Sequence, residues 1–267
     1  MREQRFVFGE AAELYDRVRA GYPEALVEEV LRFTGVEVER IRALEVGAGT
    51  GKATVAFAAR GMEILALEPS PGMAAVATRH CRGFPRVRIV GVTFEDWPVE
   101  EGGFDLLFSA QAWHWVDPSV RYPKAAEALR AGGTLALFWH ESNWQGEPLR
   151  DQLDDLYRRL APELHARNPS LPGLSPRRPD GGDGEVAAEI RGAGHFEDVA
   201  VRTYPWLARH TGDELVEVLE SQSDHRLLPA ATRARLFAAL RELVAAGGGE
   251  VVIPHRTFLA MARRCSP

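Results

Sequence analysis

Three glycines at alternating positions are the residues of this chain whose spacing most clearly suits chemistry. Gly47, Gly49 and Gly51 lie in the string ALEVGAGTGKAT (43–54), between an apolar run and a helix-patterned segment. Glycine lets the backbone turn tightly and approach a ligand, and the first amides of the following helix can point at a polar group there. The spacing therefore predicts a turn that holds a nucleotide-like ligand.

Three kinds of site compete for this turn. A P-loop needs a glycine where this chain has Val46, and Ser or Thr where it has Ala53. A dinucleotide-binding turn needs a third glycine at the position of Lys52, and without it the helix loses its closest packing against the strand. The P-loop is therefore excluded, and a nicotinamide dinucleotide site is disfavoured.

A carboxylate follows the next apolar run. Glu68 lies in ALEPSPGM (66–73), at the end of the second expected strand. A carboxylate at that place can accept hydrogen bonds from both hydroxyl groups of a ribose, a geometry that NAD enzymes and methyltransferases share. Glu68 therefore predicts a ribose without choosing between the two classes.

The elements that must position these residues alternate between strands and helices. Such alternation is typical of βαβ units on a parallel sheet, with the ligand at the carboxyl ends of the strands. Strands are expected at 41–46, 62–67, 87–92, 104–109, 134–139, 195–206 and 250–264, and helices at 51–60, 71–80, 118–130, 147–164, 212–222 and 229–246, with a loop at 171–185.

These elements predict one α/β domain over residues 1–267. Helices on either side of a break at Gly21-Tyr22-Pro23 form an N-terminal lid over residues 8–35. A cofactor-binding core is expected at 41–140. Residues 141–267 supply insertion helices and a hairpin-like sheet edge, which completes a doubly wound, mostly parallel sheet.

Several motifs resemble a known family. The Gly-x-Gly-x-Gly turn preceded by Glu45 resembles the first motif of class I S-adenosylmethionine-dependent methyltransferases. The string FDLLFSAQAWHWVDP (104–118) resembles the fourth motif of small-molecule methyltransferases related to the trans-aconitate methyltransferase group, and ALRAGGTLALFWH (128–140) resembles the turn and strand after that motif. Tyr15-Asp16-Arg17, with Arg19, is similar to the N-terminal signature of that group. The resemblance covers residues 8–140 and implies a Rossmann-like, seven-stranded sheet.

The resemblance also implies the cofactor, S-adenosyl-L-methionine, and the residues that would hold it. In the loop TFEDWP (93–98) it places Phe94 and Glu95 beside the adenine, with Asp96 as the alternative acid. The full implied set is Tyr15, Arg19, Glu45, Gly47, Ala48, Gly49, Thr50, Gly51, Glu68, Pro69, Ser70, Met73, Phe94, Glu95, Ser109, Ala110 and Gln111.

A sulfonium donor limits what the protein must do. Its positive charge vanishes as the methyl group leaves, so catalysis is mainly the alignment of nucleophile, methyl carbon and sulfur in a pocket without water. A nucleophile with a high pKa would still need a base, for which His114 is the candidate and His140 a weaker one. The alternative is that His114 packs with Trp113 and Trp115. A carboxylate nucleophile would need no base.

The acceptor pocket can be sketched only from residue types. Trp139, Trp144 and His255 are candidates for its lining, although tryptophan is often a core residue. The Arg19 guanidinium could hold a carboxylate through paired hydrogen bonds. The pattern indicates neither the identity of the acceptor nor the oligomeric state.

The composition of the chain limits which classes of binding partner we expect. The net charge of -6 disfavours a nucleic acid, so the expected acceptor is a small molecule. The two cysteines, Cys81 and Cys265, lie far apart, which predicts neither a disulfide framework nor a metal site. No run of residues is long and apolar enough for a membrane span, and MREQRFVFGEAAELYDR (1–17) lacks the apolar run of a secretory signal. We therefore expect a cytoplasmic location.

Two alternatives to a methyltransferase stay open at this point. One is a nicotinamide-dependent oxidoreductase, which the missing third glycine disfavours. The other is a protein that binds S-adenosylmethionine or S-adenosylhomocysteine without catalysis, because a fold does not by itself imply an activity.

Overall fold

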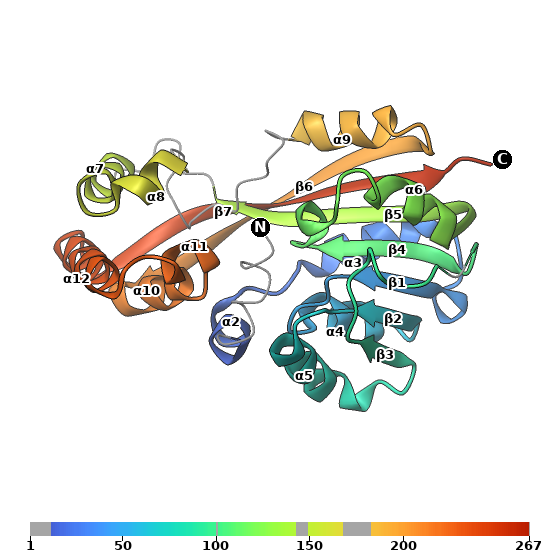
Figure 1. The fold of residues 1–267 in the computed structure, drawn as a ribbon, viewed down its shortest axis with the longest axis horizontal. Coiled ribbons are helices and arrows are strands. Elements are labelled where there is room, and N and C mark those ends of the chain that lie inside the picture. Colours follow the sequence, from blue (N-terminus) through green and yellow to red (C-terminus); the bar gives the residue numbers. More distant parts are fainter. Residues whose placement is uncertain (1–11, 100, 143–148, 168–182, 267) are drawn as a thin grey trace. The chain divides into compact units, whose positions relative to one another are not determined.

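The computed structural model describes residues 12–99, 101–142, 149–167 and 183–266 (Figure 1). Their contacts divide the chain into two compact units. The core unit consists of Ala20–Trp139, Arg178–Tyr204 and Thr257–Pro267, and the helical unit consists of Met1–Arg19, His140–Arg177 and Pro205–Arg256. No described helix is long and apolar enough to cross a bilayer.

The described residues form one seven-stranded sheet in the order β3-β2-β1-β4-β5-β7-β6. Its strands β3, β2, β1, β4 and β5 pair in parallel, as the βαβ pattern predicts. The strands are β1 Arg42–Val46, β2 Glu63–Leu67, β3 Val87–Val90, β4 Phe104–Ala110, β5 Leu129–Ser142, β6 Phe196–Thr211 and β7 Glu250–Arg264.

Helices connect these strands in the core unit and make up most of the helical unit. The helices are α2 Ala12–Val18, α3 Glu24–Thr34, α4 Lys52–Ala58, α5 Pro71–His80, α6 Arg121–Ala128, α7 Arg150–Leu160, α8 Pro162–Arg167, α9 Asp183–Gly192, α10 Gly212–Glu220, α11 Ser223–Arg226 and α12 Ala230–Ala246. A short 3-10 helix covers Trp113–Trp115.

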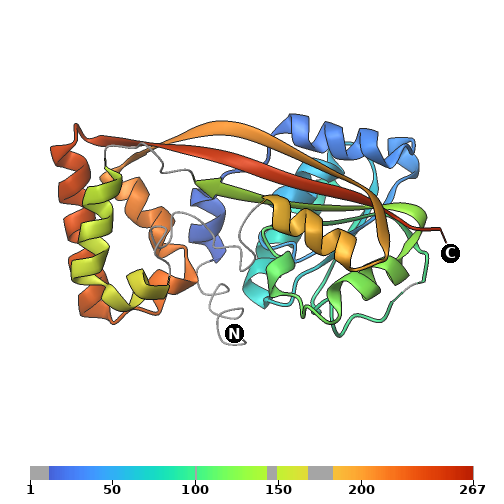
Figure 2. The same ribbon diagram turned by 90° about the horizontal axis from the view of Figure 1, so that it is seen from above.

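Helices cover both faces of the core sheet, as a doubly wound fold requires. On one face, α3 and α4 pack on a cluster in which Phe57, Phe108 and Phe138 stack, with 4.4 Å between the Phe57 and Phe108 ring centroids. On the other face, α6 and α9 pack on a second cluster (Figure 2). Burying one such phenylalanine contributes about 1.5–3 kcal/mol, so these clusters fix the strands that carry the site.

The helical unit has an apolar core of its own. Leu153, Leu215, Leu240 and Ile253 are buried there, from α7, α10, α12 and β7. The α10 helix begins at a capping box, in which the Thr211 hydroxyl and the Glu214 side chain each satisfy an amide of the first turn. These contacts make the unit compact in its own right.

The strand and helix predictions are confirmed with shifted ends, except that the helix expected over 147–164 is divided into α7 and α8. The β5 strand begins at Leu129, whereas the expected helix over 118–130 ends at Ala128. The β4–β5 ladder is irregular there, and a Cβ on Gly133 would lie 2.8 Å from the Arg130 carbonyl oxygen, so the strand starts with a bend that periodicity does not reveal. The β6 strand also continues past its expected end at 206, to Thr211.

The α9 helix was not predicted. It begins at Asp183, inside the segment 171–185 that was expected to be a loop, and residues 171–182 lie outside the described part of the chain. Its buried residues Val186, Ala187 and Ile190 have helical spacing and were the signal that sequence reasoning missed.

Candidate active site

The glycine-rich turn joins β1 to α4. Gly47, Gly49 and Gly51 have φ angles of 75°, 58° and 86°, which lie in the left-handed region that glycine adopts most readily. A Cβ on Gly47 would lie 2.3 Å from the Ala112 Cβ, and one on Gly51 would lie 3.1 Å from the Ala77 Cα. A Cβ on Gly49 would meet no described atom within 4 Å. Gly49 therefore borders open space, while the other two glycines permit close packing.

Glu68, which follows β2, is fixed against this turn. Its Oε2 accepts a hydrogen bond from the Gly49 amide at 2.7 Å, and its Oε1 accepts one from the Ser70 amide at 2.8 Å. Burial raises the pKa of Glu68, and these two bonds oppose that effect by stabilising the ionised form. Each carboxylate oxygen keeps further acceptor capacity for a ligand hydroxyl.

A second carboxyl group lies beneath the turn. Glu45 is fully buried on β1, and its Oε2 accepts a hydrogen bond from the Thr54 hydroxyl at 2.6 Å. Burial raises the pKa of Glu45 to about 8, the Thr54 bond opposes that rise, and repulsion from Glu68 adds to it. Glu45 is therefore mostly a neutral acid at pH 7. Sequence reasoning did not identify Thr54, whose hydroxyl is recognisable as a partner only once α4 is packed.

Three polar side-chain atoms at the strand ends are buried without a hydrogen-bond partner among the described residues. They are Thr50 Oγ1, Ser70 Oγ and Gln111 Oε1. A buried polar atom without a partner costs about 1–3 kcal/mol. Their clustering at the loops after β1, β2 and β4 is what a polar ligand with several donors and acceptors would satisfy.

Hydrogen bonds join the end of β4 to the neighbouring strands β1 and β5. They come from residues of the string 104–118, which resembles the fourth motif. The Ser109 hydroxyl donates to the Val46 carbonyl at 2.8 Å, and the Gln111 amide donates to the Phe138 carbonyl at 3.0 Å. Gln111 has a φ of 61°, which is uncommon for a residue other than glycine. Ser109 therefore holds β4 beside the turn, while Ala110 and Gln111 continue toward the carboxyl edge.

Three of the implied residues surround the first two strand ends. Ala48 is buried in the turn and its amide donates to the Leu67 carbonyl at 3.0 Å. Pro69 follows Glu68 directly, and Met73 is buried on α5. Their part in binding stays a prediction.

The loop after β3 places its two expected residues differently. Phe94 is a core residue, with its ring centroid 5.9 Å from that of Trp113. Glu95 is half-buried, its Oε1 accepts from the Asp117 amide at 3.1 Å, and its carbonyl accepts from the Lys124 ammonium at 2.7 Å. The alternative acid, Asp96, is exposed and accepts from the Thr93 hydroxyl at 2.9 Å. Of the two acids, Glu95 is the less exposed, and its contact with an adenine stays a prediction.

His114 lies between two tryptophans, as its motif predicts. Trp113 is buried in the core, and the rings of His114 and Trp115 lie 4.9 Å apart. The Trp139 indole nitrogen donates to His114 Nδ1 at 3.4 Å. This contact favours the tautomer in which the hydrogen of the neutral imidazole is on Nε2. Trp139 is itself buried, so it supports His114 from the core.

The N-terminal residues of the predicted site belong to the helical unit. The Arg19 guanidinium lies 5.1 Å from the Tyr15 ring centroid, and Arg19 Nε donates to the Ser221 hydroxyl at 3.2 Å. Arg17 forms an ion pair with Glu217 on α10. The expected lid is thus divided, because α2 packs with α10 whereas α3 belongs to the core unit.

His255, a candidate for the acceptor pocket, and His140, the weaker candidate base, also lie in the helical unit, whereas Trp139 belongs to the core unit. The rings of His255 and Trp206 stack with centroids 4.3 Å apart, and His140 meets the Trp206 ring edge-on at 5.2 Å. Trp144 lies outside the described residues. Sequence reasoning missed Trp206 and His210, although the period-two alternation of β6 places both on one face of the strand.

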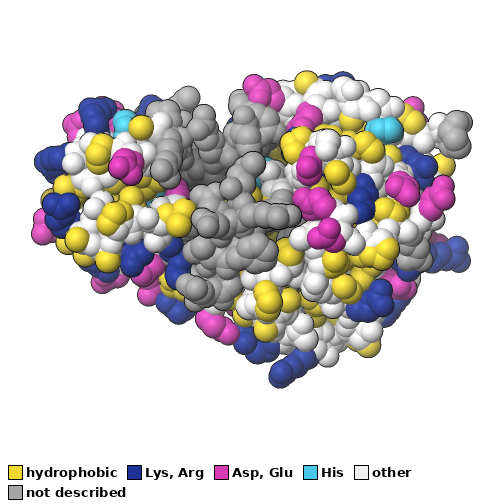
Figure 3. All heavy atoms as spheres, viewed as in Figure 1, with side chains coloured by type: hydrophobic (Ala, Val, Ile, Leu, Met, Phe, Trp, Pro, Cys, Tyr) yellow, Lys and Arg dark blue, Asp and Glu magenta, His cyan; other side chains and the backbone are white. Residues whose placement is uncertain are grey.

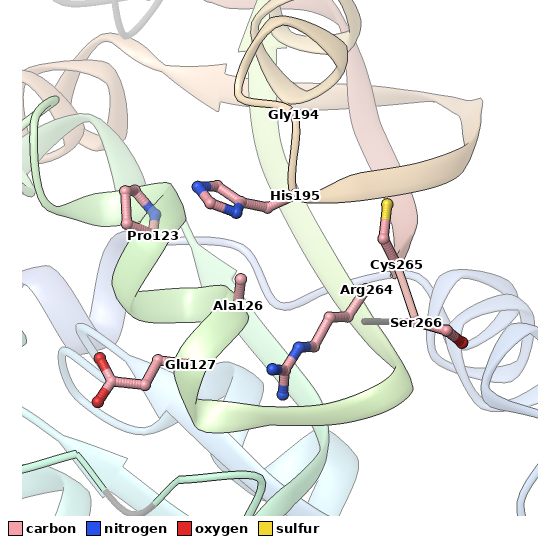
Figure 4. A pocket seen from close by; sticks show the side chains of 8 residues that line it. All are labelled: Pro123, Ala126, Glu127, Gly194, His195, Arg264, Cys265 and Ser266. Atoms are coloured by element: carbon pink, nitrogen blue, oxygen red, sulfur yellow. The ribbon is translucent and has the colours of Figure 1, made fainter.

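A pocket elsewhere on the core unit is a different site. It lies between α6, the start of β6 and the end of β7 (Figure 4). Arg264, one of its lining residues, donates to the carbonyl of Leu129 at the first position of β5. That is the amino end of a parallel strand, opposite to the edge that carries the glycine turn. The pocket is lined by Pro123, Ala126, Glu127, Gly194, His195, Arg264, Cys265 and Ser266.

Comparison with known proteins finds methyltransferases. Residues 44–137 match a family model described as a methyltransferase domain. An uncharacterised methyltransferase of Mycobacterium tuberculosis is 28% identical over 98% of this chain and 97% of its own length.

Two solved structures share the fold. The YcgJ protein of Bacillus subtilis has a TM-score of 0.57 at 18% identity, covering 92% of this chain and 100% of that one. Phosphoethanolamine N-methyltransferase 2 of Haemonchus contortus, solved with phosphomonomethylethanolamine and S-adenosylhomocysteine, has a TM-score of 0.54 at 14% identity and covers 97% of this chain and 58% of its own.

These findings weigh against both alternatives, the oxidoreductase and the non-catalytic binder. The relation to the trans-aconitate group in particular stays a prediction. The sheet order, the glycine turn with its carboxylate and the matching relatives support a class I S-adenosylmethionine-dependent methyltransferase, with S-adenosyl-L-methionine as its cofactor.

Proposed function

We propose that this methyltransferase acts on a small molecule and binds its cofactor at the carboxyl ends of β1, β2 and β4. The observation that carries the binding site is the Glu68 carboxylate, which the Gly49 and Ser70 amides hold beside the open side of the turn. When bound, the cofactor supplies a methyl group on a sulfonium. The residues of the chain must bind the cofactor and the acceptor, align them and exclude water.

The residues divide this work by chemistry. Glu68 accepts hydrogen bonds from the ribose hydroxyls, and the unpartnered atoms of Thr50, Ser70 and Gln111 take the remaining polar groups of the cofactor. Glu95 is the acid proposed for the adenine. Tyr15 and Arg19 remain candidates for either the cofactor or the acceptor, because their unit contains neither the turn nor Glu68.

We assign His114 a positioning role. Its Nδ1 accepts from the Trp139 indole, so the nitrogen that would take a proton is already engaged, and Nε2 carries the hydrogen of the ring. Such a histidine can orient the methyl acceptor by donating a hydrogen bond to it, but it does not deprotonate the methyl acceptor. A nucleophile that is already ionised, or that has a free lone pair at neutral pH, suits this arrangement.

The surface supports a small-molecule acceptor. On the face shown in Figure 3, the Lys and Arg side chains of the described residues are interspersed with Asp and Glu and form no continuous basic patch. The overall charge of -6 has the same implication. Polyanions such as nucleic acids bind to extended basic surfaces, so we keep the small molecule as the acceptor.

Transfer of a labelled methyl group into a metabolite extract tests the proposal. The protein, labelled cofactor and extract should give a labelled product of low mass, which can then be identified. Label found only in nucleic acid or protein would contradict a small-molecule acceptor. Titration with S-adenosylhomocysteine and with NAD provides the binding control, and tight NAD binding without S-adenosylhomocysteine binding would contradict the cofactor site.

His114 has a test of its own. His114→Gln retains a donor, so it should leave the affinity for S-adenosylhomocysteine unchanged and keep more turnover than His114→Leu. If His114 were a general base, both variants would lose turnover equally, and the acidic limb of the kcat–pH profile would disappear. That second outcome would overturn the positioning role.

A further inference from the structure

A compact group of rings in the helical unit has no part in the cofactor site. The imidazole–indole cluster consists of His140 on β5, Trp206 on β6 and His255 on β7. Trp206 stacks on His255 with 12° between the ring planes, and His140 meets Trp206 edge-on at 72°. Adjacent strands contribute the three side chains, so the sheet itself holds them together.

His255 presents an acceptor atom to this cluster. Its Nδ1 is buried and has no hydrogen-bond partner among the described residues. Its ring also bonds to the Glu141 backbone, and because a carbonyl can only accept, Nε2 carries the hydrogen. Burial and the positive groups nearby lower the pKa of His255 to about 4, so the imidazole is neutral at pH 7. Nδ1 is therefore a lone pair that awaits a donor.

The surroundings of the cluster are rich in groups that carry or can take positive charge. Burial and then His140, His210 and Arg19 lower the pKa of His255, so these three groups all lie within electrostatic range of its ring. The pKa of His210 is itself lowered by burial, against an opposing effect of Glu214. Two carboxylates also act on these groups, Glu214 on His210 and Asp224 on Arg19.

Several described carboxylates on the same strands and on α10 already have partners. Glu141 forms an ion pair with Arg256 at 2.8 Å, and Glu250 forms one with Arg209 at 3.0 Å. Glu214 caps α10 through Thr211. Asp224 on α11 lies within electrostatic range of Arg19, whereas Glu141, Glu250 and Glu214 are engaged elsewhere and leave Arg19 to an anion from outside the chain.

We infer that the imidazole–indole cluster binds the methyl acceptor, and that this acceptor is a small anion which also donates an O–H or N–H hydrogen to His255 Nδ1. The inference rests on the proposed function and adds the chemical class of its acceptor. Arg19 attracts the anionic group, Trp206 supplies an aromatic surface, and the lone pair of His255 fixes the orientation. An anionic acceptor also agrees with a site that lacks a dedicated base, because an anionic oxygen is already a nucleophile.

Fractionation of the extract before the reaction tests the charge of the acceptor directly. A metabolite extract is passed over an anion-exchange resin at neutral pH, and the bound and unbound fractions are each incubated with the protein and labelled cofactor. Labelled product should form from the bound fraction. Label formed from the unbound fraction overturns the inference and leaves the proposed function intact. No label from either fraction, with S-adenosylhomocysteine binding intact, contradicts the proposed function instead.

Variants of His255 test the hydrogen bond with the acceptor that the fractions yield. His255→Leu removes the lone pair and should raise the KM for the acceptor about tenfold, the usual effect of one lost hydrogen bond. His255→Gln keeps an acceptor atom and should stay closer to the native KM. Neither change should alter the affinity for S-adenosylhomocysteine. Equal and unchanged KM values in both variants would overturn the role of His255.

Two further variants complete the design. Arg19→Gln removes a positive charge and should raise the KM for the anionic acceptor more at low salt than at high salt, because salt screens the attraction. His80→Gln changes an exposed histidine of the core unit and serves as the control. A salt-independent KM in both the native protein and Arg19→Gln would contradict the electrostatic part of the inference.

Discussion

The Gly49 amide donates to Glu68 Oε2 at 2.7 Å, so the glycine turn after β1 and the carboxylate after β2 form one unit. The bond explains why two residues that sequence reasoning treats separately act on the same ligand. It places the carboxylate beside the one glycine of the turn whose Cβ position is open.

Gly49→Leu should abolish binding of S-adenosylhomocysteine while the protein still folds. The new side chain would enter the open space, and the left-handed backbone would cost on the order of 1–2 kcal/mol. Gly61→Leu is a matched control, since Gly61 also has a positive φ and an open Cβ position but lies after α4, away from the turn. Calorimetric titration of both variants checks this. Equal affinities would mean that the turn does not bind the cofactor.

Glu68→Gln should weaken S-adenosylhomocysteine binding about 10- to 100-fold, because hydrogen bonds to a charged group contribute about 1.5–3 kcal/mol. The control is Glu63→Gln at the exposed start of the same strand, where Glu63 pairs with Arg42. Both affinities can be measured by equilibrium dialysis. A loss of the same size in the control would show a general effect of charge on the strand.

Glu45→Gln should change how stability depends on pH. The folded-state pKa of about 8 lies above the unfolded value, so the stability that protonated Glu45 contributes is fully present below the unfolded pKa and is lost as the pH rises through about 8. Across that window the free energy of unfolding of the native protein should fall relative to that of Glu45→Gln, by about 1.4 kcal/mol per pH unit at most. Urea denaturation at several pH values measures the difference. Parallel curves would contradict a neutral Glu45.

Tyr157→Phe should destabilise the helical unit by about 1–3 kcal/mol. The Tyr157 hydroxyl lies 2.8 Å from His225 Nε2, and His225 Nδ1 lies 2.9 Å from Asp224, in a chain of hydrogen bonds in which Tyr157 and His225 are buried and Asp224 is half-buried. Removing the hydroxyl leaves the His225 nitrogen without its donor. Hydrogen exchange of amides in α7 would report the loss. If the native protein and Tyr157→Phe prove equally stable, the bond contributes nothing.

The sequence by itself determined the sheet, the turn and the order of the strand-end residues. Periodicity and glycine spacing are local properties, and parallel strands bring Gly49, Glu68 and Gln111 to one edge whatever the details of packing. The sequence did not predict the bend at the start of β5, because that bend depends on contact with Arg130. It did not predict the α9 helix either, because this helix comes after a segment with weak periodicity.

Only the tertiary structure decided which groups share an environment. Burial raises the pKa of Glu45, Trp139 fixes the tautomer of His114, and three strands assemble His140, Trp206 and His255. Tertiary structure also assigned α2 and Arg19 to a different unit from the glycine turn. These facts depend on contacts between residues far apart in the chain, so local spacing carries no record of them.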